Sequence, residues 1–145
     1  MKKFLLVLAI AAATTVGFLQ SGVLPQYAAV ARESNSEQAF ADALENRSSD
    51  LQIEGRGIVA RILSDDLDGS RHQRFIVELE SGQTLLVAHN IDVAPKVDQL
   101  REGDDVMFYG EYEWTPQGGV IHWTHDDPDG DHPDGWIRHR GRTYR

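Results

Sequence analysis

The spacing of apolar positions changes once along this chain, and the change separates a helical segment from a series of strands. In residues 32–50, Phe40 and Leu44 belong to an apolar stripe at the spacing of an α-helix. Ser34 and Glu37 have the Ser-x-x-Glu spacing of a capping box, which is typical of a helix start. A run of polar residues then ends the stripe. This segment is therefore predicted to form one short helix over residues 32–50.

From Leu51 onward, apolar and polar residues alternate, which is the pattern of a strand with one buried face. Turn-forming residues interrupt the alternation, most clearly at residues 80–83 and 115–118. A longer connection at residues 90–104 has room for only a turn or two of helix. The pattern predicts five strands. The first contains Gly55 and Gly57 and continues through Ile62, and the others lie at residues 72–79, 84–89, 106–114 and 119–123.

A three-stranded meander, a short helical connection and a final hairpin are the element order of the OB-fold, a five-stranded Greek-key barrel. Gly55 and Gly57 suit the sharp coiling that a small barrel requires of its first strand. We therefore predict a mainly β protein, an OB-fold-like five-stranded barrel over residues 51–145 with an irregular C-terminal segment rich in His, Asp and Arg. The alternative is an open antiparallel sheet with the N-terminal helix on one face.

The first residues have the layout of a bacterial secretory signal. Two lysines precede an apolar run from Phe4 to Leu19, and Ala29-Val30-Ala31 offers a cleavage site between small residues. We predict a signal peptide over residues 1–31 and no lipoprotein anchor, because no cysteine follows the run. The alternative is an uncleaved membrane anchor, since residues 4–24 could just cross a bilayer. Either way, the domain is expected to be periplasmic or secreted.

Composition excludes several chemistries. Among 145 residues there is no cysteine, so disulfides, a thiol nucleophile and Cys-ligated zinc are ruled out. The formal charge is −9, and it becomes −11 without Lys2 and Lys3, because residues 1–31 contain no acidic residue. A domain this acidic repels phosphate groups, which argues against nucleic acid as a partner. Removal of the signal would also leave nothing for stable membrane insertion.

Four histidines are expected to meet at one pole of the predicted barrel. His72 begins the second strand, His89 ends the third, and His122 and His125 end the fifth, which runs parallel to the third in an OB-fold. Imidazole and carboxylate groups together bind zinc and other divalent transition metals. These four histidines are therefore the predicted metal ligands. The alternative is that they form hydrogen bonds that tie loops together across the mouth of the barrel.

Other polar and aromatic side chains near this pole or in the C-terminal segment are candidates for binding a ligand. They are Asp66, Arg74, Asn90, Asp92, Trp123, Asp127, His132 and Trp136. The acidic run at residues 126–131 resembles the start of a calcium loop. However, His132 stands where such a loop needs glycine, and Arg138 stands where it needs glutamate. The run is therefore interpreted as a solvated turn.

Four segments resemble a family of small exported bacterial proteins known only as a domain of unknown function. They are DDLDGSRHQRFIVEL, SGQTLLVAHNIDVAP, GDDVMFYGEYEW and GGVIHWTHDDPDGDHPDGWI, and they contain the motifs HNID and HWTH-x-DP. The resemblance spans residues 55–144 and implies an exported single-domain protein without an assigned activity. GIVARILSDD and NIDVAP are also loosely similar to two short pieces of the thermonuclease family, whose active-site arginine pattern is not recognisable here.

Three functions are compatible with this sequence. The leading hypothesis is an exported, non-enzymatic binding module for a small ligand, with a divalent metal at the histidine pole. The second is a metal-dependent hydrolase of the nuclease or phosphoesterase kind, in which Asp66 or Asp92 acts as base or ligand and Arg74 stabilises developing charge. The third is an interaction module that docks another protein of the cell envelope.

Overall fold

The computed structural model describes residues 23–145. The chain divides into two units, residues 1–32 and residues 33–145. In the first unit, residues 23–32 are described, and they are helical. Most of the predicted signal peptide lies outside the described residues, so its export role stays a prediction. Within residues 23–145, no helix has both the length and the apolar character needed to cross a membrane.

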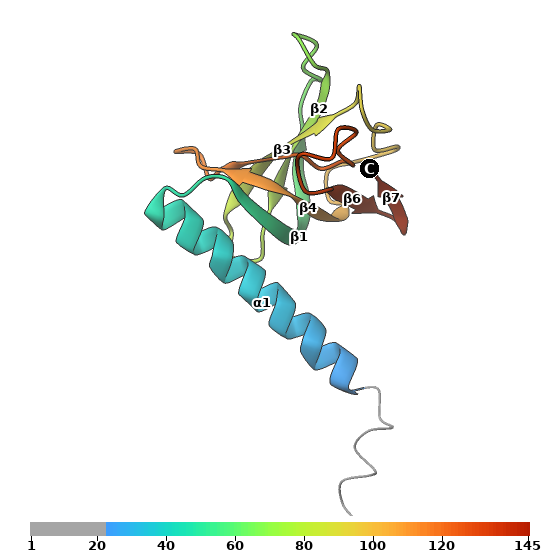
Figure 1. Cartoon of the computed structure of the whole chain (residues 1–145). Coiled ribbons are helices and arrows are strands. Elements are labelled where there is room, and N and C mark those ends of the chain that lie inside the picture. The colour runs from blue at the N-terminus through green and yellow to red at the C-terminus, as the bar shows by residue number, and fades with distance from the viewer. Residues whose placement is uncertain (1–22) are drawn as a thin grey trace, which may run out of the picture. The chain divides into compact units, whose positions relative to one another are not determined.

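Five strands close into a barrel (Figure 1). The described elements are α1 (Val23–Asn46), β1 (Leu51–Ile62), β2 (His72–Glu78), β3 (Thr84–Asn90), β4 (Asp105–Glu113), β5 (Val120–His122), β6 (Trp136–His139) and β7 (Arg142–Tyr144). The barrel order is β1-β2-β3-β5-β4, and β4 pairs back to β1. The β3–β5 pairing is parallel and the others are antiparallel. This topology confirms the OB-fold-like barrel and rules out the open sheet.

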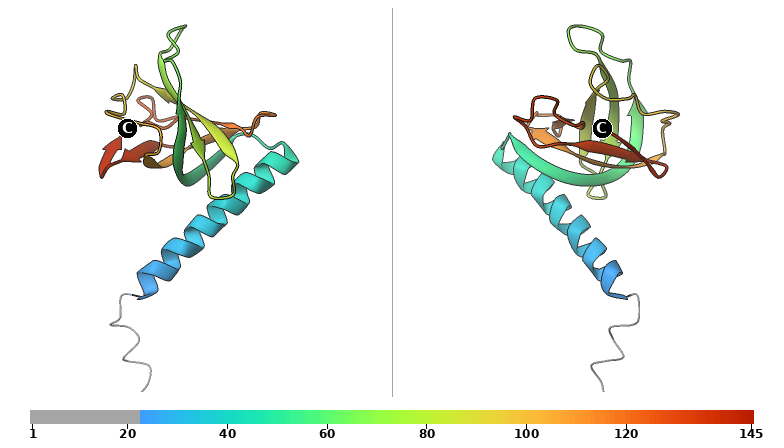
Figure 2. Two further views of the ribbon diagram at one scale, coloured as in Figure 1. Left: turned by 180° about the vertical axis from the view of Figure 1, so that it is seen from behind. Right: turned by 45° about the vertical axis from the view of Figure 1, so that its right-hand side comes forward.

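The long first strand closes the barrel because it belongs to both of its sides (Figure 2). Residues 51–58 of β1 pair with β4, and residues 58–62 pair with β2, with a bulge between Val59 and Arg61. Gly57 lies where the strand turns from one partner to the other. A Cβ atom at Gly57 would lie 2.4 Å from the carbonyl oxygen of Glu78. Glycine there lets the two backbones approach closely, as the sequence predicted for a tightly coiled strand.

Strand alternation divides the side chains into a buried set and an outer set. Phe75, Val77, Leu85, Val87 and Phe108 are almost fully buried and form much of the barrel core. The residues between them on β2, β3 and β4 are half-buried on the outer face of the barrel. Each strand position therefore faces either the apolar interior or the outer surface.

Helix α1 differs from the predicted helix at its start, and it contacts the barrel in an unexpected way. It begins at Val23, so Ser34 lies inside the helix instead of capping it. The carboxylate of Glu37 accepts hydrogen bonds from the backbone N–H groups of Glu80 and Ser81, in the β2–β3 turn, at 3.3 and 3.0 Å. Phe40, from the predicted apolar stripe, is 1% exposed. Residues 33–46 thus close the barrel pole at this turn.

The opposite pole is closed by the connection between β3 and β4, residues 91–104. This segment forms turns and no helix, which corrects the prediction of a short helical connection. Two of its own residues, Ala94 and Val97, are buried. The buried side chain of Gln73 accepts a hydrogen bond from the Val97 N–H at 2.8 Å and donates one to the Val97 carbonyl at 3.2 Å. This pair of hydrogen bonds fixes the connection over the barrel end.

The C-terminal segment is more regular than predicted. It is irregular up to Gly135, and then β6 and β7 form a hairpin that pairs with residues 106–109 of β4. The edge of β4 is open there because β5 has three residues and pairs only with residues 111–113. Pairing with β6 satisfies backbone groups that would otherwise be exposed at a sheet edge.

The contact between α1 and the barrel can be tested at Phe40. Its ring lies 6.1 Å from that of Phe108 and 5.9 Å from that of Tyr112 between centroids. Phe40→Ala is expected to lower the free energy of unfolding by about 3 to 5 kcal/mol, because it leaves a cavity in the core. Urea denaturation measures the change. The control Glu45→Ala alters an exposed position of the same helix and should have little effect. Equal stability of both variants would contradict the packing role of Phe40.

Candidate functional site

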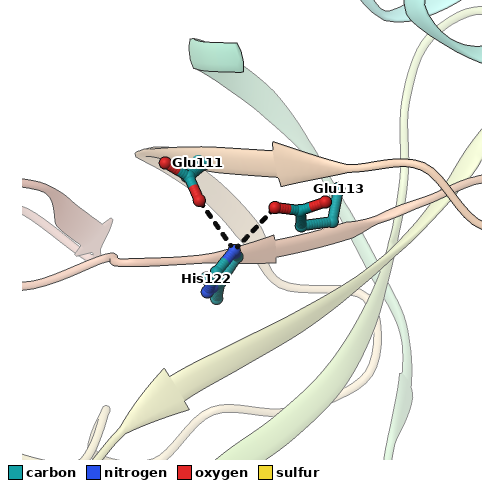
Figure 3. Close-up of side chains that lie close together, drawn as sticks. All are labelled: Glu111, Glu113 and His122. Atoms are coloured by element: carbon teal, nitrogen blue, oxygen red, sulfur yellow. Dashed lines mark ion pairs between the residues drawn. The ribbon is translucent and has the colours of Figure 1, made fainter. Parts of the chain in front are cut away.

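Two carboxylates and an imidazole converge on the outer face of the barrel, where β4 and β5 pair (Figure 3). Glu111 is the cross-strand partner of His122, and Glu113 is the partner of Val120. Nε2 of His122 lies 3.2 Å from Oε1 of Glu111 and 3.8 Å from Oε1 of Glu113. The three ligand atoms lie within 4.8 Å of one another. We call these residues the Glu–Glu–His cluster.

The Nε2 atom of His122 is buried within the cluster, although the side chain as a whole is 32% exposed. It makes no hydrogen bond to any described residue, because the nearby carboxylate oxygens lie outside hydrogen-bond geometry. A buried polar nitrogen without a partner carries a free-energy cost. The cluster therefore contains a nitrogen lone pair or N–H group that the protein itself does not satisfy.

His132 supports the cluster from the C-terminal segment. Its Nε2 lies 2.7 Å from Oε2 of Glu111, and its Nδ1 lies 2.9 Å from the carbonyl oxygen of Pro133. Both neighbours accept hydrogen bonds, so both ring nitrogens must carry protons when the two bonds form. Burial disfavours the charged ring and lowers its pKa. The hydrogen bonds to Glu111 and Pro133 and the nearby negative charges outweigh this effect, so the pKa of His132 is raised.

Trp123 connects the cluster to a neighbouring pocket. Its ring stacks on the His132 ring, with centroids 4.2 Å apart and planes 10° apart. Its backbone has a φ of 51°, in the left-handed region that costs energy for a residue with a side chain. Gly135 packs against this turn, where a Cβ atom would lie 1.9 Å from the Trp123 carbonyl oxygen. The chain therefore bends sharply just after β5.

This bend brings several of the predicted binding residues to one pocket of about 340 Å³. His72 comes from β2, Asn90 from β3 and His122 from β5, while Trp123 and His125 follow β5. The imidazole Nδ1 of His125 lies 2.7 Å from the carbonyl oxygen of Asp126, which can only accept a hydrogen bond. Nδ1 is therefore the protonated nitrogen of a neutral His125 ring. We call this the histidine pocket.

The acidic loop beside the pocket is held by its own backbone. The Asp127 carboxylate accepts hydrogen bonds from the N–H groups of His132, Asp129 and Asp131. These bonds, led by that from His132, outweigh desolvation and lower the pKa of Asp127. Since both oxygens of Asp127 serve the loop, the solvated-turn interpretation accounts for the run better than a calcium loop.

His89 has a structural environment and not that of a metal ligand. It is fully buried, and its Nδ1 lies 2.8 Å from Oγ1 of Thr124 while its Nε2 lies 3.1 Å from the carbonyl oxygen of Pro95. Desolvation is the main cause that lowers its pKa to about 4. Both nitrogens are used within the protein, as the alternative of hydrogen bonds across the barrel mouth predicted.

The four predicted metal ligands therefore do not form one ligand set. Within residues 23–145, the side chains that lie close enough together to hold a metal ion are those of the Glu–Glu–His cluster. Of the four predicted histidines, this cluster contains His122. His72, His122 and His125 share the histidine pocket, whereas His89 points into the barrel. The strand alternation explains the difference, because His89 follows the buried positions Leu85 and Val87.

The remaining predicted residues have separate local roles. Asp92 accepts hydrogen bonds from the backbone N–H and the side chain of Arg71. Both bonds lower the pKa of Asp92, and the backbone bond has the larger effect. Asp66 accepts the N–H of Asp68, and Nε of Arg74 donates to the Ser64 carbonyl. The guanidinium carbon of Arg138 lies 4.5 Å from the centre of the Trp136 ring. These side chains do not line the histidine pocket.

Sequence reasoning missed Glu111 and Glu113. The signal was present, because the 115–118 turn fixes which residues of the two flanking strands face each other across the hairpin. Counting outward from this turn pairs Glu111 with His122. The pairing lies along the strands, whereas the predicted histidine site lay at their ends.

The sequence as a whole matches one protein family. A family model described as "Protein of unknown function (DUF3465)" matches residues 23–145. The chain belongs to the DUF3465 family. This confirms the resemblance to a domain of unknown function, and the DUF3465 match covers α1, the barrel and the C-terminal hairpin. No curated protein matches the sequence.

Burial of His89 gives a testable pH dependence. The unfolded chain takes up a proton on this ring near pH 6.5, but the folded protein does so only near pH 4. Because the unfolded state binds more protons in that window, the free energy of unfolding should fall by up to about 3 kcal/mol on acidification. Below pH 4 the ring is protonated in the folded protein too, so the free energy of unfolding falls no further from this cause.

Chemical denaturation at a series of pH values measures this effect. His89→Gln should flatten the pH dependence between pH 6.5 and 4, even if the variant is less stable at neutral pH. Val87→Ala, which destabilises the same strand without changing a titratable group, is the matched control and should retain the wild-type slope. An unchanged slope in His89→Gln would contradict the assignment.

Proposed function

We propose that this DUF3465 protein is a small binding module that holds one divalent transition-metal ion at Glu111, Glu113 and His122. The observation that carries the proposal is the buried Nε2 of His122, which faces two carboxylates without a hydrogen bond to either. A metal ion placed among these atoms would accept the nitrogen lone pair and the carboxylate charge together. Histidine nitrogen and carboxylate oxygen are both established ligands of zinc and related ions.

The distances within the Glu–Glu–His cluster fit an ion of the size of zinc. Zinc–nitrogen and zinc–oxygen bonds of about 2.0 to 2.2 Å place the ligand atoms of a tetrahedral site about 3.4 Å apart. The two carboxylate oxygens lie 3.2 Å and 3.8 Å from Nε2 of His122, close to this value. Both carboxylates are therefore close enough to reach an ion bound to this nitrogen. A water molecule or an exogenous ligand would supply the fourth ligand.

His132 is suited to support the metal without binding it. Its Nε2 holds Oε2 of Glu111 at 2.7 Å, which leaves Oε1 of the same carboxylate directed at His122. Such outer contacts fix the orientation of a ligand and affect metal affinity. The proposed ligand set therefore has one histidine and two glutamates, in place of the four histidines predicted from the sequence. The leading hypothesis of a non-enzymatic binding module is favoured over the hydrolase, because Asp92 and Arg74 are engaged in hydrogen bonds away from the cluster.

We further propose that the protein acts in the periplasm or after secretion, which rests on the N-terminal pattern of residues 1–31. A partner in the cell envelope, or a small ligand, fits this location. Cell fractionation and N-terminal sequencing of the exported form test the location. Recovery of the uncleaved chain from the cytoplasm would contradict it.

Metal binding is tested by calorimetric titration of the metal-free protein with Zn²⁺ at neutral pH. One ion per chain is expected, and both His122→Ala and Glu113→Gln should weaken the affinity by at least about 100-fold, because each removes a direct ligand. Glu54→Gln is the matched control, since it removes an exposed carboxylate from β1 and should leave binding unchanged. Circular dichroism checks that each variant is folded.

Elemental analysis of protein purified from its native compartment without a metal-affinity tag identifies the ion. A near-stoichiometric transition metal that is lost in His122→Ala supports the proposal. Zinc affinity that is equal in the wild type and in the folded His122→Ala variant would refute it.

A further inference from the structure

The histidine pocket offers hydrogen-bonding groups from three strands and one large aromatic ring, separately from the proposed metal ligands. It shares only His122 with the Glu–Glu–His cluster, and in that residue Nε2 faces the glutamates. Its volume of about 340 Å³ lies within the range of small-molecule sites in proteins. The pocket is therefore a candidate site for an organic ligand.

The pocket presents polar groups without a positive charge. Histidine, asparagine and serine side chains line it, and no lysine or arginine is among the described residues that do so. The Asp127 carboxylate is already occupied by three backbone N–H groups of its own loop. Asp129 lies at the exposed rim. An anionic ligand would find no cation here, and it would enter against the net charge of −9.

Hydrogen-bond donors and acceptors are both available in the pocket. Because Nδ1 of His125 donates to the Asp126 carbonyl, Nε2 of the neutral ring is an acceptor. Oδ1 of Asn90 accepts the Asp92 N–H at 3.0 Å, which fixes the amide and leaves its NH₂ group as a donor. Such fixed, neutral and planar groups suit the hydroxyl groups of a ligand, each of which both donates and accepts.

Trp123 supplies the apolar surface. His132 stacks in parallel on one face of the indole, so at most one face is available to a ligand. This stacking disfavours insertion of a flat base between two rings. The His125 ring lies 5.4 Å from the Trp123 ring between centroids and is tilted by 39°, so a sugar would pack its C–H face on the part of the indole that lines the pocket beside His125. The left-handed backbone of Trp123 is a costly conformation that persists only where surrounding structure enforces it, and such positions are frequent at ligand sites.

From this combination we infer that the histidine pocket binds a small, neutral, hydroxyl-rich molecule of the saccharide class. The sugar ring packs on Trp123, and its hydroxyl groups form hydrogen bonds with Asn90 and His125. The inference does not require a metal ion in the Glu–Glu–His cluster.

The test is a titration of the purified protein with glucose, N-acetylglucosamine, cellobiose and chitobiose, followed by amide chemical shifts in two-dimensional NMR. The solution contains EDTA at about pH 8, where imidazole is neutral. At least one of these saccharides should give saturable shifts at residues of the pocket with a dissociation constant in the millimolar range or tighter. Glucuronate and glucose 6-phosphate, the charged analogues, should bind at least about tenfold more weakly than glucose.

Two variants connect binding to the pocket. Trp123→Ala and Asn90→Ala should each weaken the affinity by about tenfold or more, whereas Trp114→Phe changes a tryptophan outside the pocket and should not. Because Trp123→Ala could disturb the turn after β5, Asn90→Ala serves as the variant that keeps this turn. Glu113→Gln should lose zinc but retain saccharide binding, which separates this inference from the proposed metal function.

Three results would overturn the inference. The first is the absence of shifts at the pocket with all four neutral saccharides at the highest soluble concentration. The second is tighter binding of a charged analogue than of its neutral parent. The third is binding of adenosine, tested in parallel, in preference to every saccharide, which would assign the pocket to a nucleobase.

Discussion

Closure of the barrel through β1 is the constraint on which the rest of this structure depends. One strand pairs with both β2 and β4, and this is sterically feasible because Gly57 lets the backbone of Glu78 approach. Once the sheet is closed, each strand residue lies either in the apolar interior or on the outer face. That division determines which polar side chains are buried as structural elements and which are available for binding.

The buried polar residues close one end of the barrel. Gln73 and His89 are cross-strand partners that face inward, and each forms hydrogen bonds to the β3–β4 connection. Polar groups at these positions would be costly without partners, so the connection must stay in place to satisfy them. The low pKa of His89 is a consequence of the same burial.

On the outer face, by contrast, some polar groups have no hydrogen-bond partner within the protein, as Nε2 of His122 shows. The β4–β5 pairing sets His122 between two glutamates, and the sharp turn at Trp123 directs the following residues back over the outer face. The Asp127 loop then places His132 against both Trp123 and Glu111. A short β5 is central to this arrangement, since it leaves room for β6 on the same edge of β4. The Glu–Glu–His cluster and the histidine pocket thus share the imidazole of His122.

The sequence by itself predicted the five barrel strands and their order, because period-two alternation and turn residues are local signals. It favoured the closed barrel, but the β1–β4 pairing that excludes an open sheet came from the tertiary structure. It also identified most residues of the histidine pocket, since OB topology brings the ends of β3 and β5 to the start of β2. Only the tertiary structure decided which histidines are free to bind. His89 shares the inward phase of Leu85 and Val87, whereas His122 faces outward to Glu111 and Glu113. The contact of Glu37 with the β2–β3 turn and the pairing of β6 with β4 depend on long-range packing, which no local pattern encodes.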